Sequence, residues 1–161
     1  MNVKILSSSV GRLLRKNEKT LAVAESCTGG LLSHLITETP GSSDYFLGGI
    51  IAYHNRIKSS ELGIDPLTIK KNGAVSGIVA KKMAQNVRSL LKSDHAVGIT
   101  GIAGPGGGSK TKPVGLVYVA IAAKRRVFCR RFRFSGTRSE IKSSAAHHAL
   151  DLLKLALLKT R

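Results

Sequence analysis

The chain has 161 residues, of which 42% are hydrophobic, so it is long and apolar enough for one globular domain with a real core. A net charge of +17, from 26 Lys and Arg against 9 Asp and Glu, favours anionic partners. The longest apolar runs fall far short of the roughly 20 residues that cross a bilayer, which excludes a membrane-spanning protein. The N-terminus lacks the apolar core of a signal peptide, and two cysteines exclude a disulfide framework. We expect a single cytoplasmic domain over residues 1–161.

Helices and strands alternate in the first half of the predicted structure. The predicted elements are a helix over 3–17, a strand over 20–25, a helix from 31 to Pro40, a strand over 46–54 and a short helix over 55–63. Glycines inside the second strand indicate a bulge or a close backbone approach. A loop is then expected through Asp65 and Pro66.

The second half predicts a helix, a strand, a hairpin and a closing helix. The elements are a helix over 76–91 with Ser76 as N-cap, a strand over 95–100, a hairpin of 114–123 and 127–134 turning at Lys124-Arg125, and a helix after the capping-box pattern Thr137 to Glu140. This order predicts an α/β fold, a three-layer α/β/α domain with a mixed β-sheet flanked by helices.

Four segments follow predicted strands, where functional sites of α/β sheets gather. They are AESCTGG (24–30), YHNRIK (53–58), TGIAGPGGGS (100–109) and FSGTR (134–138). Together they offer hydroxyls, a lysine, a tyrosine, an arginine and many backbone N–H groups, but no metal-ligand set. The sequence therefore predicts nucleophilic chemistry without a metal or cofactor.

Ser26 lies at a strand-to-helix turn, where its hydroxyl could attack while the following N–H groups face an oxyanion. A serine before a helix is more often an N-cap, although Thr28 can take that role instead. Cys27 is the stronger intrinsic nucleophile, but alternation along the strand turns it away from the side that Ser26 faces. Cys27 is therefore the second candidate.

A serine nucleophile needs a base. Of the histidines, only His54 adjoins a strand end; the others are His34, His95, His147 and His148. Lys58 is the alternative base, because a desolvated lysine can lose its proton near neutrality. On spacing alone, however, Lys58 is better explained as an exposed helix charge.

The run GPGGGSKT (104–111) approaches the phosphate-loop pattern, with Ser109 where the second glycine belongs. A true phosphate loop opens a helix, whereas Pro113 and a strand follow here. The run is a glycine-rich connection or a nest of N–H groups for an anion. Arg138, at the start of the last helix, could hold a phosphate or could simply be exposed.

The densest basic cluster, KRRVFCRRFRF (124–134), falls on the predicted hairpin. Interleaved Arg and Phe could bind a nucleic-acid backbone and stack bases. The favoured interpretation is an edge strand whose charges discourage aggregation.

Seven segments together resemble the C-terminal domain family of the competence/damage-inducible protein CinA. They are AESCTGG, GGIIAYHNRIK, LGI, GAVS, ITGIAGPGGGS, KPVGLVYVA and FSGTR. Each is weak alone, but their joint order and similar separations are specific and cover nearly the whole chain. The chain is similar to the stand-alone form without the larger N-terminal domain of many members. It departs from the family pattern at His54 to Ile57 and in its arginine-dense hairpin.

This resemblance implies a nicotinamide mononucleotide amidohydrolase with a three-layer α/β/α fold that forms homo-oligomers. Matching positions make Ser26 the nucleophile, Lys58 its base and Tyr53 a partner of the lysine. The implied substrate-binding residues are Cys27, Thr28, Gly29, Gly30, Gly48, Asn55, Thr100, Gly101, Gly104, Gly106 and Arg138. The alternative is an accessory protein that binds a nucleotide without turnover, or that binds nucleic acid.

Overall fold

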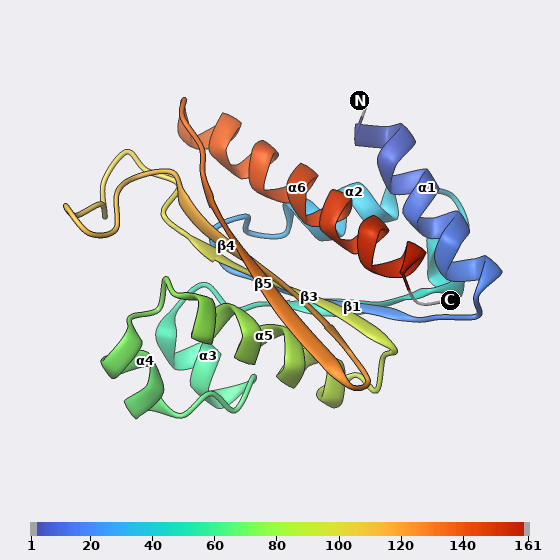
Figure 1. The fold of residues 1–161 in the computed structure, drawn as a ribbon, viewed down its shortest axis with the longest axis horizontal. Helices are drawn as coiled ribbons and strands as arrows, with labels where there is room; N and C mark the ends of the chain where they lie inside the picture. Colours follow the sequence, from blue (N-terminus) through green and yellow to red (C-terminus); the bar gives the residue numbers. More distant parts are fainter. Residues whose placement is uncertain (1–2, 160–161) are drawn as a thin grey trace.

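A five-stranded mixed sheet forms the middle layer of the computed structural model, which describes residues 3–159 (Figure 1). The strands lie in the order β2-β1-β3-β4-β5. Strand β1 pairs in parallel with β2 and β3, whereas the β3–β4 and β4–β5 pairs are antiparallel. The strands are β1 (Leu21–Glu25), β2 (Phe46–Ile51), β3 (His95–Gly101), β4 (Leu116–Ala123) and β5 (Arg126–Arg133).

Helices cover both faces of this sheet, which confirms the predicted three-layer α/β architecture (Figure 1). One face carries α1 (Val3–Lys16), α2 (Leu31–Thr37) and α6 (Arg138–Leu158). The other carries α3 (Asn55–Ser60), α4 (Pro66–Asn72) and α5 (Gly77–Leu90). Alternate residues of β1 enter the two cores, with Leu21 and Val23 facing α1 and α6, and Ala22 and Ala24 facing α5.

The predicted elements are found with small shifts, apart from one missed helix. Helix α4 occupies part of the segment expected to be a loop. Asp65 is its N-cap, accepting a hydrogen bond from the Leu67 N–H, and Pro66 is its first residue. The predicted strand over 46–54 ends at Ile51, because Ala52 already begins the turn into α3.

The predicted close backbone approach in the second strand is real. The β1–β2 register shifts between Leu21 and Ala22, and a Cβ on Gly49 would lie 2.6 Å from the Val23 carbonyl oxygen. Strand β3 has a similar position, since a Cβ on Gly98 would lie 2.5 Å from the Ala80 carbonyl oxygen of α5. The missing side chain at Gly49 therefore lets β2 lie close to β1, and the one at Gly98 lets α5 lie directly on β3.

None of the helices within residues 3–159 has the length and apolar character needed to cross a membrane. The longest of them, α6, begins with the predicted capping box, in which Thr137 and Glu140 exchange side-chain and backbone hydrogen bonds. This cap fixes the start of α6, where Arg138 stands.

Candidate active site

A cavity of about 270 Å³ opens where β1 and β3 end, at the carboxyl edge of their parallel pair. Four of the five segments around it are those that sequence analysis singled out. Its lining residues are Ser26, Cys27, Tyr53, Asn55, Lys58, Ala74, Val75, Thr100, Gly101, Ile102, Ala103, Gly104, Gly106, Gly107 and Arg138.

Ser26 and Lys58 are in direct contact at the bottom of this site. The Nζ atom of Lys58 lies 3.0 Å from the Oγ atom of Ser26. Both side chains are buried, and Lys58 is only 1% exposed. Lys58 is therefore not the exposed helix charge that spacing alone favoured.

Two main-chain carbonyls hold Lys58 from the other side. Its Nζ donates to the Ala52 oxygen over 2.7 Å and to the Tyr53 oxygen over 3.2 Å. Carbonyl oxygens only accept, so both bonds require N–H groups of the lysine, whereas the Ser26 hydroxyl can either donate or accept. A neutral Lys58 with both its N–H groups on these carbonyls directs its lone pair toward Ser26.

Burial also favours the neutral form of this lysine. Desolvation lowers the pKa of Lys58 from its ordinary value and outweighs the opposing effect of the Cys27 thiol. The arrangement of Ser26 and Lys58 is therefore that of a nucleophile with an adjacent base.

Glu25, the last residue of β1, holds the turn that follows Ser26. Its buried carboxylate accepts hydrogen bonds from the N–H groups of Gly30, Leu32 and Ser33 over 3.0, 3.1 and 2.8 Å, and from the Ser33 hydroxyl over 2.7 Å. A carboxylate at this position accepts the free N–H groups in the first turn of α2, and its negative charge is attracted to the positive end of the helix dipole.

The prediction that Thr28 caps α2 is wrong, because Glu25 already occupies those N–H groups. Gly30 is the N-cap residue of α2 and has a positive φ of 97°. Because glycine has no side chain, it cannot cap the helix itself. The Oγ1 atom of Thr28 is buried and has no hydrogen-bond partner among the described residues. Sequence analysis missed Glu25, whose signal is a carboxylate at the end of a buried strand that leads into a helix start.

The N–H groups after Ser26 divide into two sets. Gly29 donates to the Ser26 carbonyl and Gly30 to Glu25. Those of Cys27 and Thr28 donate to no backbone carbonyl within residues 3–159. Of these two residues only Cys27 lines the cavity, so its N–H is the one that could face a developing oxyanion.

Cys27 has the wrong setting for a nucleophile. Its side chain belongs to the core under α1, α2 and α6. Burial raises the pKa of its thiol to about 12, so the thiolate is scarce at neutral pH. Cys27 nevertheless also lines the cavity beside Ser26.

Arg138 joins two sides of the cavity mouth. Its Nη1 donates to the Gly104 carbonyl over 2.6 Å, and its Nη2 donates to the Tyr53 hydroxyl over 2.6 Å. Tyr53 thus contacts Lys58 through its carbonyl and Arg138 through its hydroxyl. Tyr53 is 57% exposed, so part of it is accessible to a ligand.

Thr100 supports the opposite wall. This buried residue, near the end of β3, donates its hydroxyl to the Ala74 carbonyl over 2.9 Å. The bond ties β3 to the segment between α4 and α5, which contributes Ala74 and Val75 to the lining. Both lie in the GAVS segment of the family resemblance, but neither was predicted as a site residue, because small apolar residues in a loop carry no chemical signal.

Ten of the predicted site residues line the cavity: Ser26, Cys27, Tyr53, Asn55, Lys58, Thr100, Gly101, Gly104, Gly106 and Arg138. Four do not: Thr28, Gly29, Gly30 and Gly48. The first three belong to the turn that Glu25 holds, and Gly48 lies within β2, paired with Ala22. Their contribution is therefore to backbone shape.

The five histidines supply no base here, since none lines the cavity. His54 is nearest in sequence to the site, but its Nδ1 accepts a hydrogen bond from the Arg56 N–H and caps α3. Within residues 3–159 there is also no cluster of three or more His, Cys, Asp or Glu that could hold a metal ion. The titratable side chain in contact with Ser26 is that of Lys58.

The fold and this site define a three-layer α/β domain with a buried Ser–Lys pair. The CinA C-terminal domain family matches residues 3–157, and the chain belongs to that family. A CinA-like protein of Thermosynechococcus vestitus is 51% identical over 156 residues, which cover 95% of this chain and 38% of that protein. A CinA-like protein of Trichormus variabilis is 50% identical over 161 residues, which cover 98% of this chain and 39% of that protein. The chain thus spans little more than a third of these relatives.

Solved structures of similar proteins share the fold over almost their whole length. The competence/damage inducible protein CihA from Agrobacterium tumefaciens matches with a TM-score of 0.94 and 36% identity, covering 98% of this chain and 96% of that one. The competence damage-inducible protein A from Klebsiella pneumoniae subsp. pneumoniae MGH 78578 matches with a TM-score of 0.97 and 27% identity, covering 100% of both chains.

Proposed function

We propose that this protein hydrolyses the carboxamide of nicotinamide mononucleotide, giving nicotinic acid mononucleotide and ammonia. The observation that carries the proposal is the buried 3.0 Å contact between Lys58 Nζ and Ser26 Oγ at the bottom of an open cavity. The resemblance to CinA C-terminal domains supplies the substrate, since that family includes such amidohydrolases.

The first step is acyl transfer to Ser26. Neutral Lys58 takes the hydroxyl proton while Oγ attacks the carboxamide carbon, and the carbonyl oxygen becomes an oxyanion. The N–H group of Cys27 stabilises that charge. Lys58 then gives its proton to the departing nitrogen, so the C–N bond breaks, ammonia leaves and an ester to Ser26 remains.

The second step returns the free enzyme. Water enters where ammonia left, and Lys58 removes its proton as the water oxygen attacks the ester carbon. The ester bond breaks, and Ser26 Oγ recovers a proton from Lys58. The net reaction consumes one amide and one water and gives one carboxylic acid and one ammonia.

Arg138 holds the substrate's 5′-phosphate in this proposal. Two of its N–H groups are occupied by Gly104 and Tyr53, and three of the five remain for an anion. The exposed Tyr53 ring lies between Arg138 and Lys58, where the pyridinium ring could stack on it.

Ammonia release from nicotinamide mononucleotide tests the proposal. The native protein should release ammonia, Ser26→Ala and Lys58→Ala should lose at least about 1000-fold in kcat, and Cys27→Ala should keep most activity. Cys27 is the matched control because it adjoins Ser26 and lines the same cavity.

No release by native protein that still binds the nucleotide would favour a binding module over an enzyme. Full activity in Ser26→Ala would instead overturn only the mechanism. An adduct on Ser26 with the mass of the acyl nucleotide, seen after rapid acid quenching, would support the ester intermediate.

A further inference from the structure

A second and larger cavity, of about 760 Å³, lies between the C-terminal half of α6 and the β4–β5 hairpin. It is formed by His95, Ile121, Ala123, Lys124, Arg125, Arg126, Phe128, Cys129, Arg130, Leu152, Leu155, Ala156 and Lys159. We call it the hairpin groove. It lies toward the start of β3, whereas the candidate active site lies where β3 ends; Figure 1 shows the hairpin tip and the loop after β3 at opposite ends of the sheet.

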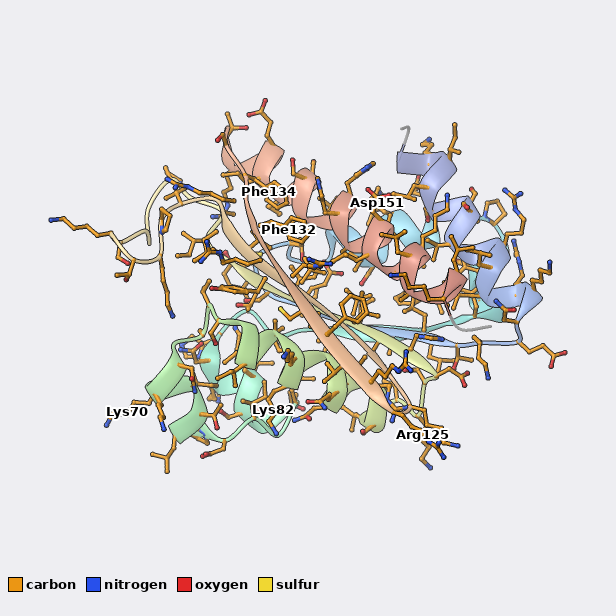
Figure 2. The ribbon with its side chains drawn as sticks, in the orientation of Figure 1. Lys70, Lys82, Arg125, Phe132, Phe134 and Asp151 are labelled. Atoms are coloured by element: carbon orange, nitrogen blue, oxygen red, sulfur yellow. The ribbon has the colours of Figure 1, made fainter. Side chains whose placement is uncertain are left out.

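The rim of the hairpin groove is strongly positive. Five cationic side chains line it: Lys124, Arg125, Arg126, Arg130 and Lys159. All five are exposed, no ion pair within residues 3–159 includes them, and no Asp or Glu lines the groove. Figure 2 shows Arg125 at the tip of the hairpin. Such a concentration of uncompensated charge is complementary to several phosphates.

The floor is apolar and has an aromatic ring. Phe128 is 38% exposed and Leu155 53% exposed, and Ile121 and Leu152 complete the surface between them. Arg126 and Arg130 flank Phe128 on the same face of β5, because side chains two residues apart share a face. This Arg-Phe-Arg arrangement can stack a planar base and bind its phosphates.

His95 adds a buried polar group to the wall. The side chain is only 3% exposed, and its Nδ1 has no hydrogen-bond partner among the described residues. Burial lowers the pKa of His95, so its ring is neutral and each nitrogen is either a donor or an acceptor. An unpaired buried nitrogen is costly unless a ligand satisfies it.

We propose that the hairpin groove binds a free nucleotide that carries two or more phosphates. The base lies on Phe128 and the aliphatic floor, with a ring nitrogen or amino group on His95, and the phosphates lie on the arginine rim. The cavity has the size of a small-molecule site, roughly 300 to 1000 Å³, whereas a nucleic-acid strand needs a longer track. This site is separate from the Ser26 cavity and does not depend on its activity.

Calorimetric titration with ATP tests the proposal. The variant Arg126→Glu/Arg130→Glu reverses charge inside the groove, and Arg131→Glu/Arg133→Glu makes the same change on the same strand outside it. The native protein and the outside variant should bind one ATP per chain with Kd values within about twofold, and the groove variant should bind at least about tenfold more weakly. Equal unfolding temperatures of the two variants would show that both are folded.

Further probes separate the base from the charge. Phe128→Ser should weaken ATP binding about fivefold but leave binding of inorganic triphosphate unchanged. The proposal is overturned if the native protein does not bind ATP, if both charge-reversal variants lose binding equally, or if neither does. It is also overturned if triphosphate binds as tightly as ATP, or if an oligothymidylate strand binds more tightly than ATP.

Discussion

Arg138 and Tyr53 are 85 residues apart in the chain, yet the Arg138 guanidinium donates to the Tyr53 hydroxyl over 2.6 Å. The same guanidinium donates to the Gly104 carbonyl. The start of α6, the end of the β2–α3 turn and the loop after β3 therefore meet at one side chain. This junction orients the group that we expect to bind phosphate.

Removing the Tyr53 hydroxyl tests that junction. Tyr53→Phe deletes an acceptor of Arg138 but keeps the ring and the carbonyl that holds Lys58. KM for nicotinamide mononucleotide should rise about fivefold, which corresponds to about 1 kcal/mol, with little change in kcat. Steady-state kinetics measure both quantities.

Tyr118→Phe is the matched control, because Tyr118 packs near α5 and does not line the cavity. A fall in kcat of Tyr53→Phe with unchanged KM would contradict a role in phosphate binding and favour one in proton transfer.

Activity should fall as the solution becomes acidic. Burial lowers the pKa of Lys58 below the ordinary lysine value of 10.5, and only the neutral amine can act as base. The rate kcat/KM should therefore rise with pH through that lowered pKa and level off above it. Values of kcat/KM measured from about pH 6 to about pH 10 would reveal this rising part of the pH profile. A flat profile would argue against Lys58 as base.

The same shift predicts a trend in stability. Between the lowered pKa and 10.5, the unfolded chain binds a proton at Lys58 that the folded protein does not. The free energy of unfolding of the native protein should therefore increase with pH across this window, relative to Lys58→Met. Urea unfolding of both proteins at several pH values measures the difference. A constant difference would mean that Lys58 is charged in the folded state.

Glu25 should contribute to the stability of the fold. Glu25→Gln presents an NH₂ group to N–H donors of α2, so we expect a loss of about 3 kcal/mol and a Tm lower by about 10 °C. Ser33→Ala removes one of the four hydrogen bonds and should cost about 1 kcal/mol. Thermal unfolding measures both. If both substitutions lowered the stability equally and only slightly, the carboxylate would not be needed for α2 to begin at its observed position.

The contact of α5 with β3 gives a purely structural prediction. A methyl group at Gly98 would collide with the Ala80 and Ala84 backbone, so Gly98→Ala should destabilise the protein by about 2 kcal/mol. Gly106→Ala is the control, since a Cβ there has nothing within 4 Å. Chemical denaturation measures the free energy of unfolding of both variants. An unchanged free energy of unfolding in Gly98→Ala would show that α5 can shift away from β3 without cost.

Local patterns in the sequence account for most of the fold. The β4–β5 turn at Lys124-Arg125, the Ser76 cap and the Thr137 capping box are found where short-range rules predict them. Helix α4 was missed because Asp65-Pro66 reads equally well as a turn or as a helix start, and only the packing of Ile69 into the core decides.

The site was less accessible to local reasoning. Local spacing indicates an exposed charge at Lys58, because nothing in its own helix shows that α3 faces Ser26. Only the family resemblance pairs Lys58 with Ser26. Glu25 was missed because its partners come from the next helix, five to eight residues on. Such contacts depend on the path of the turn, which residue types alone do not determine.

The two carbonyls that hold Lys58 belong to the main chain of Ala52 and Tyr53. Every residue type offers the same carbonyl, so exchanging the side chain at either position leaves the anchors of the amine intact. Substitution at position 53 can therefore change the side chain at the cavity mouth without removing the carbonyls that hold the Lys58 amine. Because the amine is held by the main chain, mutations of the surrounding side chains can change the specificity of the site while Ser26 and Lys58 stay in place.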